Sequence, residues 1–310
     1  MINKPNFSNW HIINTLLISS STIIITLLCF SNSFYYYTLN HWYACYYLFL
    51  SVWSLFHVNF TPYQLCILTW YINTVWFWMI NSVLIWADYN NPEQWVKYKI
   101  QEGTNIPLDM NKFWHVIRIV LVNQFYALIF YLIAYYFTSE FVHAEKLPTF
   151  NRLIYELLFI ILIEEIFFYY GHRLLHTRFF YKRFHKVHHE WTSSIGVVSI
   201  YCHPVEHIMT NIFPVILGPL LMQSHIMVIW LWSSLATFNA VLTHSGYHLP
   251  WMSSPEAHDY HHKTFTEIYG VFGILDYLHG TDKRFRNSKH YDLHKIYYTD
   301  SYAQERIRKN

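Results

Sequence analysis

The chain has 310 residues, of which 54% are hydrophobic, 21% aromatic and only 13% charged. This composition is typical of a membrane protein and excludes an ordinary soluble domain. The formal net charge of +2 is close to neutral. The sequence has no cluster of basic residues of the kind that would predict nucleic-acid binding. The cysteines are scattered without CxxC spacing, which predicts neither a disulfide framework nor a thiolate metal site: Cys29, Cys45, Cys66 and Cys202.

Apolar segments long enough to cross a bilayer recur along the chain, since a hydrocarbon core of ~30 Å requires ~20 helical residues. The first, at residues 11–30, predicts a membrane anchor that is retained. Residues 34–60 are apolar but rich in Tyr and Trp, so they predict either a span or an interfacial segment. Further runs predict spanning helices at residues 63–87, 113–137 and 153–170.

Residues 203–241 are apolar again, with a polar turn at 223–225. Two helices of about 18 residues on either side of this turn would form a hairpin that returns the chain to the side it left. His225 would then lie at the far end, where we expect it to bind no metal. By the positive-inside rule, a basic cluster after residue 170 predicts a cytosolic face: Arg173, Arg178, Lys182, Arg183 and Lys186.

The sequence therefore predicts an all-α membrane protein with four or more transmembrane helices and a cytosolic helical cap. We expect an N-terminal transmembrane region at residues 1–150 and a catalytic domain at residues 151–282. Residues 283–310 are polar and basic, so we expect them to form a cytosolic tail. We expect the cap to contain the reactive site, because the polar loops that follow the apolar helices carry most of the clustered histidines.

Ten histidines gather in two HxxxH and two HxxHH motifs: His172, His176, His185, His188, His189, His244, His248, His258, His261 and His262. Helical residues four apart project from one face, so each HxxxH pair can share a metal. The hairpin brings all four motifs to one side of the membrane. Neutral imidazole is the commonest protein ligand of zinc, iron and copper, and ten imidazoles exceed what one ion accepts. The sequence therefore predicts a histidine-rich site for two metal ions.

Two acidic residues are candidate catalytic carboxylates. Glu165 precedes His172 by seven residues and shares its helix face, whereas Asp259 lies inside the last HxxHH motif. A carboxylate in an apolar helix is costly unless it is paired. We therefore expect Glu165 to accept a hydrogen bond from the non-ligating nitrogen of a metal-bound histidine. The alternative is a polar residue that faces a water-filled gap.

The HPVEH segment contributes further candidates. Glu206 is expected to play a supporting role like that of Asp259. His203 and His207 are four apart and resemble another ligand pair, but Pro204 bends the start of this segment. Whether these two histidines contact metal is left open by the sequence.

The segments EEIFFYYGHRLLHTRFFYKRFHKVHHEW, YCHPVEH, THSGYHLP and SPEAHDYHHKTFTEIYGVFGILDYLHGTD resemble the sterol desaturase and fatty acid hydroxylase superfamily. The resemblance covers residues from about 164 to 282. The amino acids in the motifs are most similar to those of the C4-methylsterol oxidases. It implies a non-haem diiron centre, O2 as oxidant and a sterol or alkyl lipid as substrate. Spacing alone does not distinguish iron from zinc, and purified protein can hold zinc in place of iron.

The resemblance also implies the electron source and the location. The sequence contains no glycine-rich dinucleotide fingerprint and no HPGG haem segment, so electrons must come from other proteins. The superfamily implies cytochrome b5 and its NAD(P)H-dependent reductase as partners, at the cytosolic face of the endoplasmic reticulum membrane. We expect oxidation of a sterol 4-methyl group, with fatty-acyl hydroxylation or desaturation as the second hypothesis. His279 departs from the apolar residue usual in sterol oxidases. A histidine-rich metal transporter is the third hypothesis, although its ligands would lie at membrane depth.

Overall fold

The computed structural model describes residues 36–37, 39–44, 47–48, 60–138 and 148–309. The predicted anchor at residues 11–30 and most of the run at 34–60 lie outside these ranges. The described residues form helices without any strand, and an isolated bridge joins Lys99 to Tyr247. The predicted all-α class is therefore confirmed.

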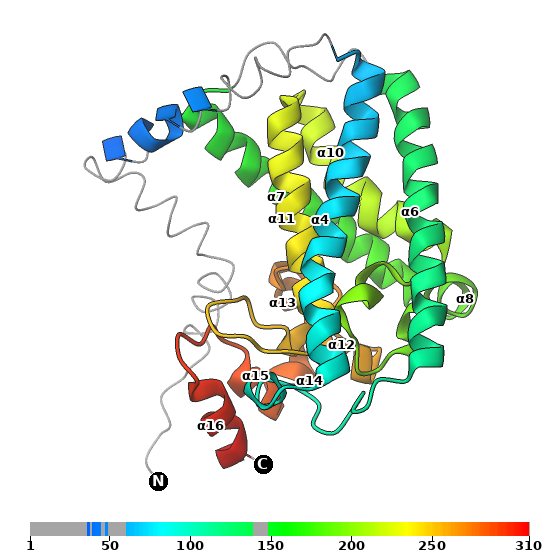
Figure 1. Cartoon of the computed structure of the whole chain (residues 1–310), viewed down its shortest axis with the longest axis vertical. Helices are drawn as coiled ribbons and strands as arrows, with labels where there is room; N and C mark the ends of the chain where they lie inside the picture. Colours follow the sequence, from blue (N-terminus) through cyan, green and yellow to red (C-terminus); the bar gives the residue numbers. More distant parts are fainter. Residues whose placement is uncertain (1–35, 38, 45–46, 49–59, 139–147, 310) are drawn as a thin grey trace.

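Five helices form an apolar bundle, in which α4, α6, α10 and α11 run side by side (Figure 1): α4 (Pro62–Asn90), α6 (Met110–Thr138), α7 (Phe150–Leu175), α10 (Phe213–Met222) and α11 (Ile226–His244). Within the described ranges, three segments are long and apolar enough to cross a membrane: Met110–Tyr136, Pro204–Met222 and Ile226–His244. The last two form the predicted hairpin. Helices α4 and α7 were also predicted to span, but neither is among these three segments. Both are long, and α7 carries three buried glutamates, Glu156, Glu164 and Glu165.

Short helical elements connect this bundle and form the cap. Those between α4 and α10 are α5 (Glu93–Val96), α8 (Arg178–Phe180), the π-helix η1 (Tyr181–His185), the 3-10 helices η2 (His188–Glu190) and η3 (Gly196–Ile200), α9 (Pro204–Glu206) and the π-helix η4 (His207–Ile212). Those after α11 are α12 (Glu256–Thr264), α13 (Ile274–His279), α14 (Lys283–Arg286), α15 (Lys289–Leu293) and α16 (Ser301–Lys309).

Local sequence signals place the ends of the bundle helices. At the start of α4, the Thr61 hydroxyl and the Gln64 side chain form a reciprocal capping box, and Pro62 occupies the first turn. The hydroxyl of Thr149 accepts a hydrogen bond from the backbone of Arg152 and so begins α7. Helices α7 and α10 approach closely at Gly218, where an added Cβ would lie 2.9 Å from the Cα of Ile160. This contact fixes α7, which carries the first histidine motif, against the hairpin.

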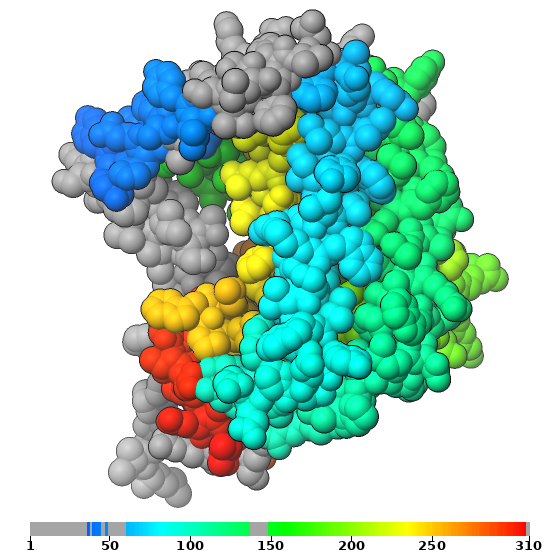
Figure 2. All heavy atoms as spheres, viewed as in Figure 1, coloured from blue at the N-terminus to red at the C-terminus, as the bar shows by residue number. Residues whose placement is uncertain are grey.

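Residues 283–309, predicted as a polar tail, fold back onto the cap. Asp300 pairs with Lys97, and Arg306 lies 2.7 Å from Glu102. The backbone of Trp251 donates to the carbonyl of Tyr297 across 2.8 Å. Figure 2 shows the red C-terminal segment against the gold loop that follows α11. This segment is therefore packed against the cap.

Candidate metal centre

The structure brings nine of the ten predicted histidines into two groups. Within each group, one nitrogen of every ring lies within 4.8 Å of the others. Site A contains His172, His176, His185, His189 and His261. Site B contains His188, His244, His258 and His262. All nine rings are buried or partly buried, and the two groups adjoin, because the ring centres of His189 in site A and His262 in site B lie 4.8 Å apart.

The HxxHH spacing divides each motif between the two sites. Residues four apart share a site, as His185 and His189 do in site A. His188, three residues after His185, faces site B. The motif on α12 shows the reverse arrangement, because His258 and His262 face site B and His261 faces site A. Each motif therefore links both sites, which fixes their relative position.

A π-helical turn aims the first of these motifs. Residues Tyr181–His185 form η1, and the chain tightens to a 3-10 turn at His188–Glu190. Such π-turns are uncommon and occur frequently at functional sites, since they redirect a side chain by one position. The change of helix type separates His188 from its neighbours and turns it toward α11.

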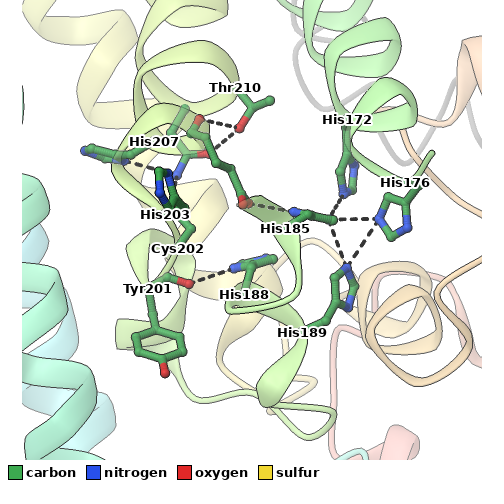
Figure 3. Close-up of polar contacts among 12 residues, drawn as sticks. His172, His176, His185, His188, His189, Tyr201, Cys202, His203, His207 and Thr210 are labelled. Atoms are coloured by element: carbon green, nitrogen blue, oxygen red, sulfur yellow. Dashed lines mark hydrogen bonds and ion pairs between the residues drawn. The ribbon is translucent and has the colours of Figure 1, made fainter. Parts of the chain in front are cut away.

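The ring nitrogens that converge are the Nε2 atoms. In site A, the Nε2 of His185 lies 2.8 Å from that of His176, 3.0 Å from that of His189 and 3.2 Å from that of His172 (Figure 3). In site B, the Nε2 of His244 lies 2.8 Å from that of His258. The same atom lies 3.2 Å from the Nε2 of His188. The cluster thus presents a set of nitrogens that face one another at short range.

The opposite ring nitrogens, Nδ1, are held by outer partners. Backbone carbonyls lie within hydrogen-bond distance of five of them: Tyr269 with His172 at 2.9 Å, Tyr201 with His188 at 3.1 Å, Ala240 with His244 at 2.7 Å, Glu267 with His261 at 2.7 Å and Trp191 with His262 at 3.0 Å. A carbonyl can only accept, so these five rings carry their proton on Nδ1. Their Nε2 atoms therefore present lone pairs to the centre of each site.

This arrangement fits metal ions and little else. Lone pairs that face each other at about 3 Å repel unless a cation or proton lies between them. Ligand nitrogens at ~2.0–2.1 Å from one metal, at right angles to each other, lie about 3 Å apart. The outer hydrogen bonds fix the tautomer and orientation that ligation needs. Sites A and B can therefore each hold a metal ion.

Burial also keeps these imidazoles available as ligands. It lowers the pKa of His188 to about 4. Burial likewise holds the pKa values of His258, His261 and His262 well below the usual range. The rings are therefore neutral at pH 7, and no proton has to leave before a metal binds.

His248 is the exception, and its predicted pairing with His244 is wrong. Helix α11 ends at His244, and the chain turns at Gly246 with φ +73°, where an added Cβ would meet the carbonyl oxygen of Ser194 at 2.8 Å. His248 is therefore not four residues further along the same helix. Its Nε2 lies 3.0 Å from the carbonyl of Lys295, and its Nδ1 lies 3.5 Å from Glu256. The ring holds the C-terminal segment in place.

The predicted role of Glu165 is also corrected. Its carboxylate accepts hydrogen bonds from the backbone amides of Val271 at 3.0 Å, Phe272 at 2.9 Å and Leu275 at 3.3 Å. It therefore holds the loop that leads into α13 and bonds to no histidine of the two sites. Asp259 also lacks such a bond among the described residues: its Oδ1 accepts from Gln101 at 3.0 Å, and its Oδ2 has no hydrogen-bond partner there.

Glu206 takes the place that was predicted for Glu165. Its Oε1 lies 2.7 Å from the Nδ1 of His185, and both side chains are buried. The expected supporting role of Glu206 is confirmed. His203 and His207 belong to neither group: the first caps the backbone of Val205, and the second contacts Asn211 at 3.3 Å. The Nδ1 of His225 accepts from the backbone of Met227 at the start of α11.

A cavity of about 840 Å³ opens beside both sites. His172 and His185 of site A border it, as do three histidines of site B, His188, His244 and His258. Its membrane end is lined mainly by apolar side chains of α4, α6, α7 and α11, among them Phe77, Ala127, Ile161 and Trp232. A lipid that fills this space would lie directly against the imidazole cluster.

Residues 157–281 match the family model of fatty acid hydroxylases. The human protein named fatty acid hydroxylase domain-containing protein 2 is 45% identical over 226 residues, which are 72% of this chain and 68% of that protein. The chain belongs to the fatty acid hydroxylase family. The match covers every histidine of sites A and B, so the family assignment and the geometry concern the same residues.

Two plant members of the superfamily are similar over nearly their whole length. A very-long-chain aldehyde decarbonylase, GL1-11 from Oryza sativa, is 33% identical over 77% of this chain and 94% of its own. Methylsterol monooxygenase 2-2 from Arabidopsis thaliana is 32% identical over 77% of this chain and 94% of its own length. No solved structure matches the chain. The chain is thus a membrane oxidoreductase of this family, in the sterol desaturase/fatty acid hydroxylase superfamily, with histidine groups able to bind metal.

Proposed function

We propose that this protein is an O2-dependent non-haem diiron oxygenase that oxidises the 4-methyl group of a sterol in sterol biosynthesis. The observation that carries the proposal is the shared cavity. Histidines of both groups border one apolar cavity that reaches between the membrane helices. A lipid from the bilayer can enter such a space and place a C–H bond beside two metals at once.

The residues of each site have a separate task. Site A would hold one iron through five imidazoles, and site B would hold the second through four. Two bound iron ions supply the activation of O2 that an unreactive C–H bond requires. Glu206 and the five carbonyl acceptors keep the rings oriented. Apolar side chains around the cavity exclude water from the reacting carbon.

Two relatives support a sterol substrate. Methylsterol monooxygenases 2-2 and 1-3 of Arabidopsis thaliana are 32% and 38% identical to this chain. In the proposed reaction, one atom of O2 enters a C–H bond of the 4-methyl group, which becomes a hydroxymethyl group. The other oxygen atom leaves as water after two electrons and two protons arrive. The second candidate, hydroxylation or desaturation of a fatty-acyl chain, is supported by the family description and by the aldehyde decarbonylase relative.

The two electrons would come from cytochrome b5, reduced by its NAD(P)H-dependent reductase. Three exposed basic residues surround the site A ligand His185 on the outside of η1: Lys182, Arg183 and Lys186. Together with the exposed Arg173 they offer a positive surface that suits an acidic electron carrier. We place this surface in the cytosol and the helices in the endoplasmic reticulum membrane, where both carrier and sterol would be available.

A lipid comparison tests the proposal. Microsomes that contain the protein, and matched microsomes that lack it, receive NADH, cytochrome b5, its reductase and O2. Extracted lipids are then analysed by mass spectrometry for 4-methylsterols and for hydroxylated or desaturated acyl chains. His188→Ala removes a site B ligand, and His41→Ala is the control, since His41 is exposed and bonds locally to the carbonyl of Tyr37.

We expect 4,4-dimethyl- and 4-methylsterols to decline with the unchanged protein and with His41→Ala, but not with His188→Ala. New hydroxylated acyl chains with unchanged sterols would move the assignment to the second candidate. If neither lipid pool changes in well-folded, metal-loaded protein, the sterol proposal is rejected.

A further inference from the structure

The cavity beside the metal sites reaches the exterior at a rim of large apolar side chains. Five residues line the cavity and are exposed at the same time: Leu235, Trp251, Ile274, Tyr277 and Leu278. Trp251 and Leu278 are each 69% exposed. A side chain that faces both the cavity and the exterior marks the mouth between them, and this rim contains no charged residue. A gathering of large exposed apolar side chains indicates contact with a membrane or with another molecule.

Helix α11 places this mouth beside the membrane. Leu235 lies in the middle of α11, within the segment Ile226–His244 that is long and apolar enough to cross a bilayer. Leu231, one turn earlier, is also exposed, so this face of α11 presents leucines to the exterior. At ~1.5 Å per residue, His244 of site B follows Leu235 by about 14 Å along the helix. The mouth therefore begins where hydrocarbon would surround α11 and leads toward the metal sites.

Helix α13 carries three of the rim residues and is fixed to the outer face of α7. That face bears an exposed stripe with residues four or eight positions apart, Leu158, Leu162 and Tyr170. At its cap-side end, the hydroxyl of Tyr170 lies 3.0 Å from the Nε2 of His279, the last residue of α13. The ring of His279 also stacks on Tyr169, with 5.3 Å between ring centres. Helix α13 thus lies where the apolar stripe of α7 ends, which is the depth of a membrane interface.

Trp251 is held at the rim in a strained backbone conformation. Its φ of +65° lies in the left-handed region, which is unfavourable for a bulky residue. Such strain persists only where the surrounding structure maintains it, and it occurs preferentially at functional sites. Here the backbone amide of Trp251 donates to the carbonyl of Tyr297 across 2.8 Å, and its ring contacts that of Tyr298 at 5.0 Å. The C-terminal segment therefore holds an exposed indole at the mouth, and indoles favour the membrane interface.

We propose that the rim is a lateral entrance, through which a membrane lipid passes from the cap-side leaflet of the bilayer between α11 and α13 into the cavity. Helix α13 and the indole of Trp251 lie in the interface, and the rim keeps the passage apolar. The lipid then reaches the histidines without crossing water, whereas an entrance from the aqueous side would leave five apolar side chains in water. This inference rests on the proposed function, in which the cavity takes up a lipid, and it adds the route by which the lipid arrives.

Photocrosslinking tests whether the rim contacts the bilayer. The photoreactive residue p-benzoylphenylalanine replaces Leu278 in the full-length, metal-loaded protein in lipid nanodiscs. In separate samples it replaces Tyr136, which is exposed on the spanning segment Met110–Tyr136, and Ile307, which is 71% exposed on α16 and does not line the cavity. After illumination, mass spectrometry should find lipid adducts at residues 278 and 136 and none at residue 307.

The rate of lipid entry tests whether the rim is the route. A cholestanol that carries a diazirine is added to the nanodiscs, and samples are illuminated at increasing times. Phe77 and Trp232 are buried and line the cavity, so their labelling reports lipid inside it. Leu121 is exposed on α6, so its labelling reports lipid in the bilayer and serves as the internal standard.

A charge on the rim should slow entry. In Leu278→Asp and in Ile274→Asp, the rate of labelling at Phe77 and Trp232 should fall about 3-fold or more, since a charged group is unfavourable at a lipid-facing position. The final extent of labelling should be unchanged, which shows that the cavity is intact. Ile307→Asp is the matched control and should label at the rate of the unchanged protein.

Other outcomes overturn the inference. Adducts at residue 136 but none at residue 278 would do so, as would a crosslink from residue 278 to a second copy of the chain, or an unchanged entry rate in both rim variants. If 4-methylsterols are oxidised while the rim variants take up the probe at the normal rate, the entrance fails and the proposed function stands. If the rim behaves as expected but no sterol is oxidised, the proposed function fails instead.

Discussion

Replacement of Glu206 should weaken metal binding at site A without disturbing the fold. Its carboxylate lies 2.7 Å from the Nδ1 of His185, whose Nε2 is at the centre of that site. Loss of this acceptor leaves the buried Nδ1 of His185 without a hydrogen-bond partner, which costs about 1–3 kcal/mol. At 1.4 kcal/mol per tenfold, Glu206→Leu should lower the affinity of site A by about 10- to 100-fold, the range found for outer partners of metal ligands. Glu206→Gln, whose amide oxygen still accepts, should lose less.

The assay is competition with a chelator. Iron-loaded protein is incubated with increasing chelator, desalted and analysed for iron by mass spectrometry. For Glu206→Leu, one iron per chain should leave at a chelator concentration about 10- to 100-fold lower than for the unchanged protein, while the second stays. Glu156→Gln is the control, because Glu156 is also buried but pairs with Arg152 on α7. Identical chelator curves for Glu206→Leu and the unchanged protein would refute the assigned role of Glu206.

Three further predictions concern the corrected residues and the buried imidazoles. Glu165→Ala should lower the melting temperature and keep full metal content, because it removes the acceptor of three loop amides and of no histidine; loss of metal would contradict this. His248→Ala should also destabilise the cap but keep both metals, whereas His244→Ala should lose one, as metal analysis of the two purified variants would show. Metal-free protein should lose stability as the pH falls from about 6.5 toward 4, since burial lowers the pKa of His188 to about 4 and the unfolded chain binds the proton first. His188 alone accounts for about 3 kcal/mol of this loss, and a pH-independent melting temperature would contradict it.

The pairing of histidines within each motif could be predicted because it depends only on residues that are close in the sequence. Helical spacing places residues four apart on one face, and this alone pairs His172 with His176 and His258 with His262. The same rule failed for His248, because the helix ends four residues earlier and Gly246 turns the chain. The glycine in THSGYH was a visible signal for that turn.

Apart from Glu206, the outer partners of the histidines could not be predicted in the same way. Glu165 has the correct helical phase, but the loop at 271–275 covers that face and satisfies the carboxylate first. Backbone carbonyls such as those of Tyr269 and Trp191 have no sequence signature, since every residue carries one. The C-terminal segment appeared to be a tail because it is polar. Its buried bonds, such as that from Tyr302 to Glu256 at 2.8 Å, depend on tertiary packing alone.

The central claim is that two separate groups of histidines hold two metal ions. The most direct test is the iron content of the purified, reconstituted full chain, compared with His261→Ala in site A and His258→Ala in site B. The account predicts two irons per unchanged chain and about one in each variant. One iron or none in the unchanged protein, or two irons retained in both variants, would contradict it.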